Sequence, residues 1–121
     1  MMANWNKMLA ATPDEIVFNG TAFQYRDHPL SGRAGQRIRL YVVNAGPSLA
    51  SAFHVIGAVF STVYPDSNPE HALTGVSTYP IAPGQGVVFD LVIPQPGKYS
   101  FVDHDMRAME LGAMGTLDIS P

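Results

Sequence analysis

The stretch 87–97 reads Val87-Val88-Phe89-Asp90-Leu91-Val92-Ile93-Pro94-Gln95-Pro96-Gly97 and has the pattern of a strand followed by a turn. From Val87 to Ile93 every second residue is large and apolar, and alternation with a period of two is typical of a β-strand. The proline- and glycine-rich residues 94–97 end that strand, since proline cannot donate a hydrogen bond to a sheet. The sequence therefore indicates a β-protein built from short strands and turns.

The same pattern extends outward over most of the chain. Residues 36–44 alternate cleanly, with Ile38, Leu40 and Val42 on one side, and Gly46-Pro47 ends that strand. Further strands are predicted at 15–19, 52–64 (one or two strands, bent at Gly57), 76–81, 99–103 and 113–119, with a polar loop at 65–75 and helical segments at 3–11 and 105–111. Seven or eight short strands predict an antiparallel sandwich or barrel.

Composition limits the partners of this domain. The 121 residues fit one domain with its own core. Only 14% of residues are charged, against roughly 25% in typical globular chains, which suggests that part of the surface is covered by a neighbour. The net charge of −3 without a basic run argues against nucleic acid and anionic membranes. No apolar stretch is long enough to span a bilayer, no signal peptide is visible, and no cysteine is present.

Two of the four histidines are candidate metal ligands. His54 lies between Phe53 and Val55 in a predicted strand, so its side chain faces away from theirs. His104 follows the strand at 99–103 and is flanked by two aspartates that could orient its ring. Imidazole is the commonest protein metal ligand and a ready proton carrier, which favours a copper site. The alternatives are a histidine bonded to a backbone carbonyl and a solvated acidic turn.

The other candidate ligands have structural explanations. His28 and His71 lie in a predicted turn and a polar loop, where polarity needs no special cause. Thioethers are soft ligands for Cu(I), but Met106, Met109 and Met114 are interpreted as core residues. The sequence contains no His-x-His pair, no Ser-His-Asp set and no glycine-rich phosphate loop.

Taken together, several segments resemble a known family. They are 13–20, Phe53-His54-Val55-Ile56-Gly57, 77–84, 95–99, and Val102-Asp103-His104-Asp105 continuing to 110–113. In order and spacing they resemble the second cupredoxin domain of copper-containing, NO-forming nitrite reductases and their multicopper-oxidase relatives. The resemblance runs from about residue 8 to 120. It implies an all-β Greek-key cupredoxin sandwich of about eight strands at 13–121, preceded by a linker or short helix at 1–12.

The resemblance also implies a site. In that family a catalytic type 2 copper lies between subunits, and His104 matches the ligand that the second domain contributes. His54 matches the proton-donating histidine, Ile56 the apolar residue that shapes the substrate pocket, and Thr78 a residue that helps to orient the catalytic histidine. We therefore expect the imidazoles of His54 and His104 to lie in one pocket at the same end of the sandwich.

The implied partners are an N-terminal cupredoxin domain carrying a type 1 copper, two further copies in a homotrimer, and a small anion such as nitrite. The parent protein is expected to be periplasmic or extracellular. This chain has no cysteine, and Asp105 stands where a first domain would carry the thiolate ligand, which excludes a type 1 site here. Without an electron-entry site, the chain alone is expected to be inactive. Two alternatives are a stand-alone cupredoxin-like trimerising or metal-binding module without redox activity, and a domain of a multicopper oxidase.

Overall fold

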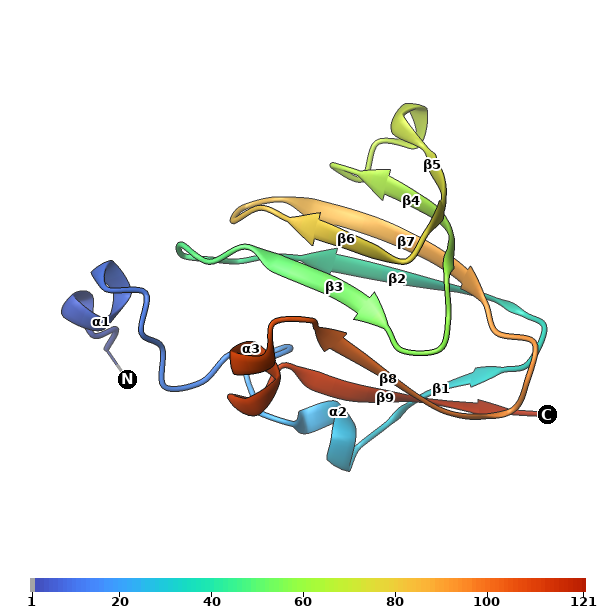
Figure 1. Ribbon diagram of the computed structural model, residues 1–121, viewed down its shortest axis with the longest axis horizontal. Coiled ribbons are helices and arrows are strands. Elements are labelled where there is room, and N and C mark those ends of the chain that lie inside the picture. Colours follow the sequence, from blue (N-terminus) through green and yellow to red (C-terminus); the bar gives the residue numbers. More distant parts are fainter. Residues whose placement is uncertain (1) are drawn as a thin grey trace.

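The computed structural model describes residues 2–121 and contains two packed β-sheets (Figure 1). The five-stranded sheet has the order β1-β9-β8-β3-β6, and the four-stranded sheet has the order β2-β7-β4-β5. The strands are β1 Leu30–Arg33, β2 Arg37–Val43, β3 Ser51–Val55, β4 Phe60–Pro65, β5 Leu73–Val76, β6 Thr78–Ile81, β7 Gly86–Val92, β8 Gly97–Asp103 and β9 Met114–Ser120. The helices are α1 Trp5–Leu9, α2 Gln24–Asp27, α3 Met106–Glu110 and the 3₁₀ turn η1 Pro69–His71. The predicted β-sandwich is confirmed.

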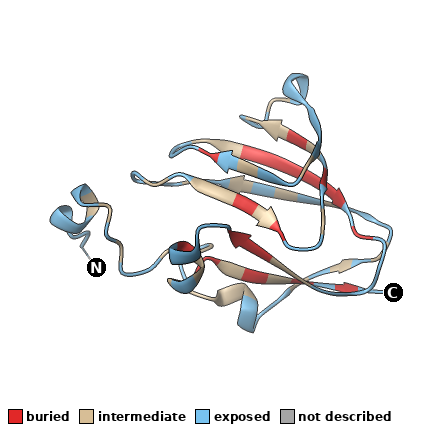
Figure 2. Cartoon of the chain, viewed as in Figure 1, coloured by how far each residue is buried: buried red, intermediate tan, exposed pale blue. Residues whose placement is uncertain are grey.

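The core lies between the two sheets and follows the predicted alternation (Figure 2). In β2 the even-numbered residues face inward, and in β7 the odd-numbered residues do. Register pairs Leu40 with Phe89 and Ile38 with Leu91, so inward side chains meet across the strands. The rings of Phe53, Phe60 and Phe89 contact one another at centroid distances of 4.5–6.0 Å. Large aromatic rings bury much apolar area, and this cluster joins the two sheets.

Several strands begin or end at residues other than those predicted from the sequence. Residues 52–64 form two strands in different sheets, and Gly57 makes the turn between them with a φ of +85°, which glycine adopts without strain. Residues 76–81 are likewise divided at Ser77, because β5 pairs with β4 whereas β6 pairs with β3. The predicted loop at 65–75 contains η1 and most of β5. The predicted strand at 15–19 forms only a single bridge between Phe18 and Thr21.

Besides η1 and β5, the elements α2 and β1 were not predicted from the sequence. β1 lies at the edge of the five-stranded sheet and pairs with β9 in parallel, Leu30 opposite Leu117, so the sandwich is not wholly antiparallel. Its sequence Leu-Ser-Gly-Arg has little strand propensity. The hydrogen bonds of β9 therefore determine its conformation.

The predicted N-terminal helix is present as α1 and stands apart from the sandwich (Figure 1). Asn4 caps it by accepting a hydrogen bond from the Lys7 amide. Trp5 and Leu9 lie one turn apart and are 64% and 69% exposed. Within residues 2–121, no helix is long and apolar enough to cross a membrane.

The outer face of the four-stranded sheet carries several exposed apolar side chains beside charged ones. Tyr41, Val43 and Val92 are 77%, 69% and 45% exposed. Among them lies an ion pair in which the Arg39 guanidinium donates two hydrogen bonds to the buried carboxylate of Asp90. Exposed apolar side chains on a sheet face are typical of a surface that another domain or subunit covers.

Candidate metal centre

His54 and His104 lie on the same outer face of the five-stranded sheet. β3 and β8 are antiparallel, with His54 opposite Val102. His104 is two residues beyond Val102, so by the period of two it shares the face of His54 and lies diagonally across from it. The two ring centroids are 5.3 Å apart, with the ring planes at 71°. The expectation that the two imidazoles lie close together at one end of the sandwich is confirmed, whereas a pocket around them stays a prediction.

Two groups at the edge of the sheet fix the imidazole of His54. Its Nδ1–H donates to the Ser77 carbonyl at 2.7 Å, and the Thr78 hydroxyl oxygen lies 3.0 Å from the same nitrogen. Thr78 is directly opposite His54 in the β3–β6 pair. Because the carbonyl can only accept, the proton of the neutral ring resides on Nδ1. Nε2 has no protein partner within the described chain and is left free.

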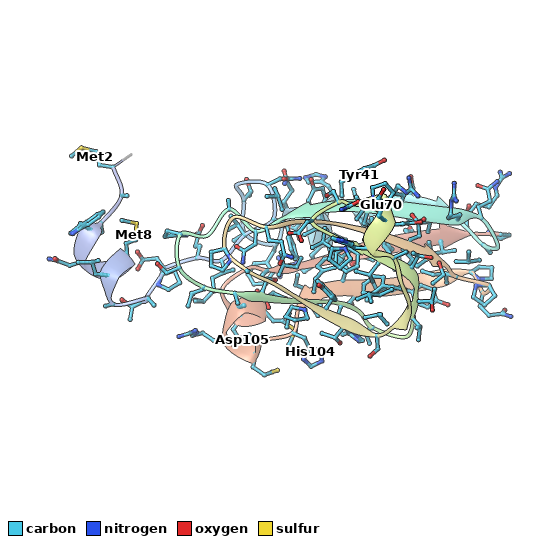
Figure 3. All side chains as sticks on the ribbon, turned by 90° about the horizontal axis from the view of Figure 1, so that it is seen from above. Met2, Met8, Tyr41, Glu70, His104 and Asp105 are labelled. Atoms are coloured by element: carbon cyan, nitrogen blue, oxygen red, sulfur yellow. The ribbon has the colours of Figure 1, made fainter. Side chains whose placement is uncertain are left out.

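His104 is held through its backbone rather than through its ring. Its N–H donates to the Ala52 carbonyl at 2.7 Å, which ties the residue to β3. Asp105 then caps α3 by accepting from the Arg107 amide at 2.9 Å. The His104 side chain is exposed and projects from the side of the molecule opposite Tyr41 (Figure 3). A short turn thus presents the imidazole beside His54.

The two aspartates flanking His104 do not orient its ring. Asp103 is buried and accepts a hydrogen bond from the Ala52 amide at 3.0 Å. Asp105 is occupied in the helix cap and lies 3.8 Å from the Arg107 guanidinium. Over residues 2–121 neither carboxylate bonds to an imidazole. The expected ring-orienting role is therefore wrong, and the two acids serve the backbone instead.

The remaining candidate residues are mostly at the surface. Ile56 follows His54 by two residues on the same side of the chain and is 46% exposed. His28 ends α2 and His71 lies in η1, both exposed. The interpretation of the methionines as core residues is wrong for Met106, which is 63% exposed, while Met109 and Met114 are half-buried.

Sequence reasoning missed one contributor, the Ser77 carbonyl. No side chain in the sequence points to this carbonyl. It lies where the chain passes from the four-stranded to the five-stranded sheet, directly before Thr78. At that crossing the carbonyl is available to the histidine, since residue 77 belongs to neither sheet.

The donor set fits part of a copper site. Imidazole nitrogen suits copper, and Cu²⁺ stands highest among divalent first-row metals in general affinity. A catalytic metal normally has three protein ligands and one open position, by analogy with zinc. The described residues contain no group of three or more His, Asp or Glu side chains arranged to hold a metal ion. The pair could therefore supply a share of such a site, the remaining ligands coming from elsewhere.

Known proteins resemble this chain in sequence and in fold. The chain is 38% identical over 116 residues to the copper-containing nitrite reductase of Neisseria meningitidis, which covers 94% of this chain. Solved structures of copper nitrite reductases from Nitrosomonas europaea and Thermus scotoductus each superpose with a TM-score of 0.91 and are 33% and 32% identical. This chain is a cupredoxin domain related to copper-containing nitrite reductases and multicopper oxidases.

This chain matches only part of the length of these relatives. The cupredoxin domain spans 30% of the Neisseria protein, and 43% and 27% of the two solved reductases. A structure of a multicopper oxidase also superposes with a TM-score of 0.80, at 28% identity over 86% of this chain. No family model matches the chain. The predicted resemblance and the cupredoxin fold are thus confirmed, and the relatives are copper enzymes of greater length.

Proposed function

We propose that this cupredoxin domain contributes to the type 2 copper centre of a nitrite-reductase-like copper oxidoreductase. His104 is one metal ligand, His54 is the proton donor, and histidines of another domain or subunit complete the site. One observation carries this proposal: two imidazoles lie 5.3 Å apart on one sheet face, and among residues 2–121 only that of His54 is fixed through a ring nitrogen. That asymmetry suits a ligand beside a proton carrier, and the similarity to copper nitrite reductases supports it.

The roles follow from the atoms that are free. Bound copper would supply the one-electron reduction of nitrite to nitric oxide, a reaction that consumes two protons and releases water. His54 binds the Ser77 carbonyl through Nδ1–H, so Nε2 is the atom that takes up a proton and delivers it to an anion at the site. General acid catalysis of this kind contributes about 10²–10⁴-fold. Thr78 keeps the ring in this orientation, and Ile56 provides an apolar wall that restricts water.

Electrons enter from outside this domain in the proposal. The chain has no cysteine for a type 1 copper, so a preceding cupredoxin domain carries that site and the isolated chain is inactive. We further propose a homotrimer in the periplasm or outside the cell. The low charge content and the exposed apolar face with Tyr41 and Val43 support association, and a head-to-tail contact that closes after three copies forms a ring.

A chimera tests the proposed function. This chain replaces the matching segment of the Neisseria meningitidis nitrite reductase, and nitrite reduction and type 2 copper content are measured together. We expect the chimera to reduce nitrite, His104→Ala to lose type 2 copper, and His54→Ala to keep copper but lose most turnover. His71→Ala is the matched control, since this exposed histidine lies in η1.

Two outcomes would contradict the proposal. A trimeric chimera that binds copper but does not reduce nitrite would favour the non-redox binding module. Full activity in His104→Ala would exclude the ligand role. For the chain alone, light scattering at high micromolar concentration tests the trimer, and a strict monomer would show that other domains supply the ring contacts.

A further inference from the structure

Asp103 is a buried carboxylate without a cationic partner. Among residues 2–121 two polar or charged residues are buried, Asp90 and Asp103, with 3% and 5% of the whole residue exposed. Asp90 forms an ion pair with the Arg39 guanidinium, but Asp103 forms no ion pair with any residue from 2 to 121. Its hydrogen-bond partner there is the backbone N–H of Ala52, at 3.0 Å. Burying a carboxylate without a cation costs free energy, so its position needs a physical reason.

The reason lies one position beyond the last pair of the β3–β8 ladder, which is Phe53 with Asp103. In an antiparallel ladder, the two residues of a hydrogen-bonded pair exchange two N–H···O bonds. Continuing the register by one residue would place Ala52 opposite His104 at such a position, and the His104 N–H does donate to the Ala52 carbonyl at 2.7 Å. The reciprocal bond is replaced, because the Ala52 N–H donates to Asp103 Oδ1. The carboxylate therefore stands in for the His104 carbonyl.

This substitution determines where the chain turns. The His104 carbonyl is released from the sheet, so the chain leaves β8 after Asp103 and enters the Asp105 cap of α3. The Ala52 N–H would otherwise be orphaned at the sheet end, which costs free energy comparable to a lost hydrogen bond. Asp103 is opposite Phe53, so it acts from the core side of the sheet while the imidazoles lie on the other side.

We propose that Asp103 is a positioning residue of the metal centre: its carboxylate replaces one ladder bond, ends β8 at residue 103, and thereby holds the His104 imidazole beside His54. The consequence for catalysis rests on the proposed function, whereas the geometry itself needs no metal. The requirement is an oxygen acceptor at this place and not a negative charge.

NMR spectroscopy of the metal-free chain tests this inference. The readouts are the nuclear Overhauser effect between the ring protons of His54 and His104, and the exchange protection of the Ala52 amide. Asp103→Asn keeps an oxygen acceptor, and Asp103→Ala removes it. Asp90→Ala is the matched control, because it also removes a buried carboxylate but on the outer face of the other sheet.

We expect the ring-to-ring signal and the amide protection in the unaltered chain, in Asp103→Asn and in Asp90→Ala, and the loss of both in Asp103→Ala. A folded Asp103→Ala chain that keeps the ring-to-ring signal would overturn the inference. If that variant does not fold, Asp103→Asn decides: a folded chain that retains both signals supports the inference, and one that loses them overturns it. A chain with the expected NMR behaviour but no type 2 copper in the chimera would contradict only the proposed function.

Discussion

Replacing Arg39 with methionine should destabilise the domain by leaving the Asp90 carboxylate buried and unpaired. Arg39 Nε lies 2.7 Å from one carboxylate oxygen of Asp90 and Nη2 lies 2.8 Å from the other. The guanidinium carbon also lies 5.6 Å from the centroid of the Tyr64 ring. The Asp90 side chain is only 4% exposed in the presence of Arg39, so a methionine of similar length should leave the carboxylate with little access to water.

The size of the loss follows from this geometry. Removing one partner of a fully buried pair costs about 3–5 kcal/mol, but the Arg39 side chain is 39% exposed and part of its interaction is screened by solvent. We therefore expect the free energy of unfolding to fall by about 2–3 kcal/mol. An unfolding entropy of about 2.1 cal/mol/K per residue, for 121 residues, converts this to a Tm lower by roughly 8–12 °C.

The effect should depend on pH in one direction. The hydrogen bonds from Arg39 lower the pKa of the Asp90 carboxyl, and this outweighs the opposing effect of burial. A carboxyl with a lower pKa in the folded state stabilises above its unfolded pKa, which is about 3.9 for aspartate, and loses that stabilisation as the pH falls further. In Arg39→Met the unpaired, buried carboxyl favours its protonated form. The difference in stability between Arg39→Met and the unaltered chain should therefore be largest near neutral pH and shrink as the pH falls toward and below about 4.

Urea denaturation followed by circular dichroism measures both effects. Arg37→Met is the matched control, because it removes an exposed arginine from the same strand and face, and should change the stability by about 0.5 kcal/mol or less. The double variant Arg39→Met, Asp90→Leu should recover most of the loss, because no buried charge remains. A loss in Arg39→Met as small as in the control, or one unchanged down to pH 3, would refute the reasoning.

Three further predictions concern the site and its support. Thr78→Val removes the hydroxyl 3.0 Å from His54 Nδ1 and should increase the mobility of that ring in ¹⁵N NMR, while the stability falls by about 1 kcal/mol or less. Calorimetric titration of the chain with Cu²⁺ should give micromolar or weaker binding, which is a binding free energy of about −8 kcal/mol at best. The affinity should weaken below roughly pH 6, because protonated imidazole cannot bind a metal, and should be lost in His104→Ala. Nanomolar, pH-insensitive binding would reveal further ligands. Gly115→Ala places a Cβ on the Phe101 ring and should cost about 1–3 kcal/mol, largely recovered by adding Phe101→Leu.

The parts of the fold that were predicted are those in which burial alone determines the pattern. β2 and β7 have one inward and one outward face, so their alternation shows in the sequence. The same alternation placed His54 on the face opposite Phe53. β1 and β5 were missed because they are short edge strands whose partners, not their own residues, determine their conformation.

The sequence predicted the side chains of the site but not the backbone groups that hold them. The pairing of His54 with His104 followed from the family resemblance and the strand ends. The sequence does not show that the chain crosses from one sheet to the other at Ser77, because a local pattern of apolar residues does not reveal which strands are hydrogen-bonded to each other. Asp103 was noticed as a neighbour of His104, but its backbone partner lies on another strand.

Because His54 is held by the backbone carbonyl of residue 77, this contact does not depend on which amino acid occupies position 77. A main-chain oxygen is present whatever residue occupies the position, so no ordinary substitution deletes the group that holds His54. The exposed Ser77 side chain is thus free to vary while its backbone function persists. A search for invariant side chains would overlook this anchor. For the experimenter the same freedom is useful: a cysteine at position 77 in this cysteine-free chain would place a single spectroscopic label next to the two imidazoles without removing any contact to them.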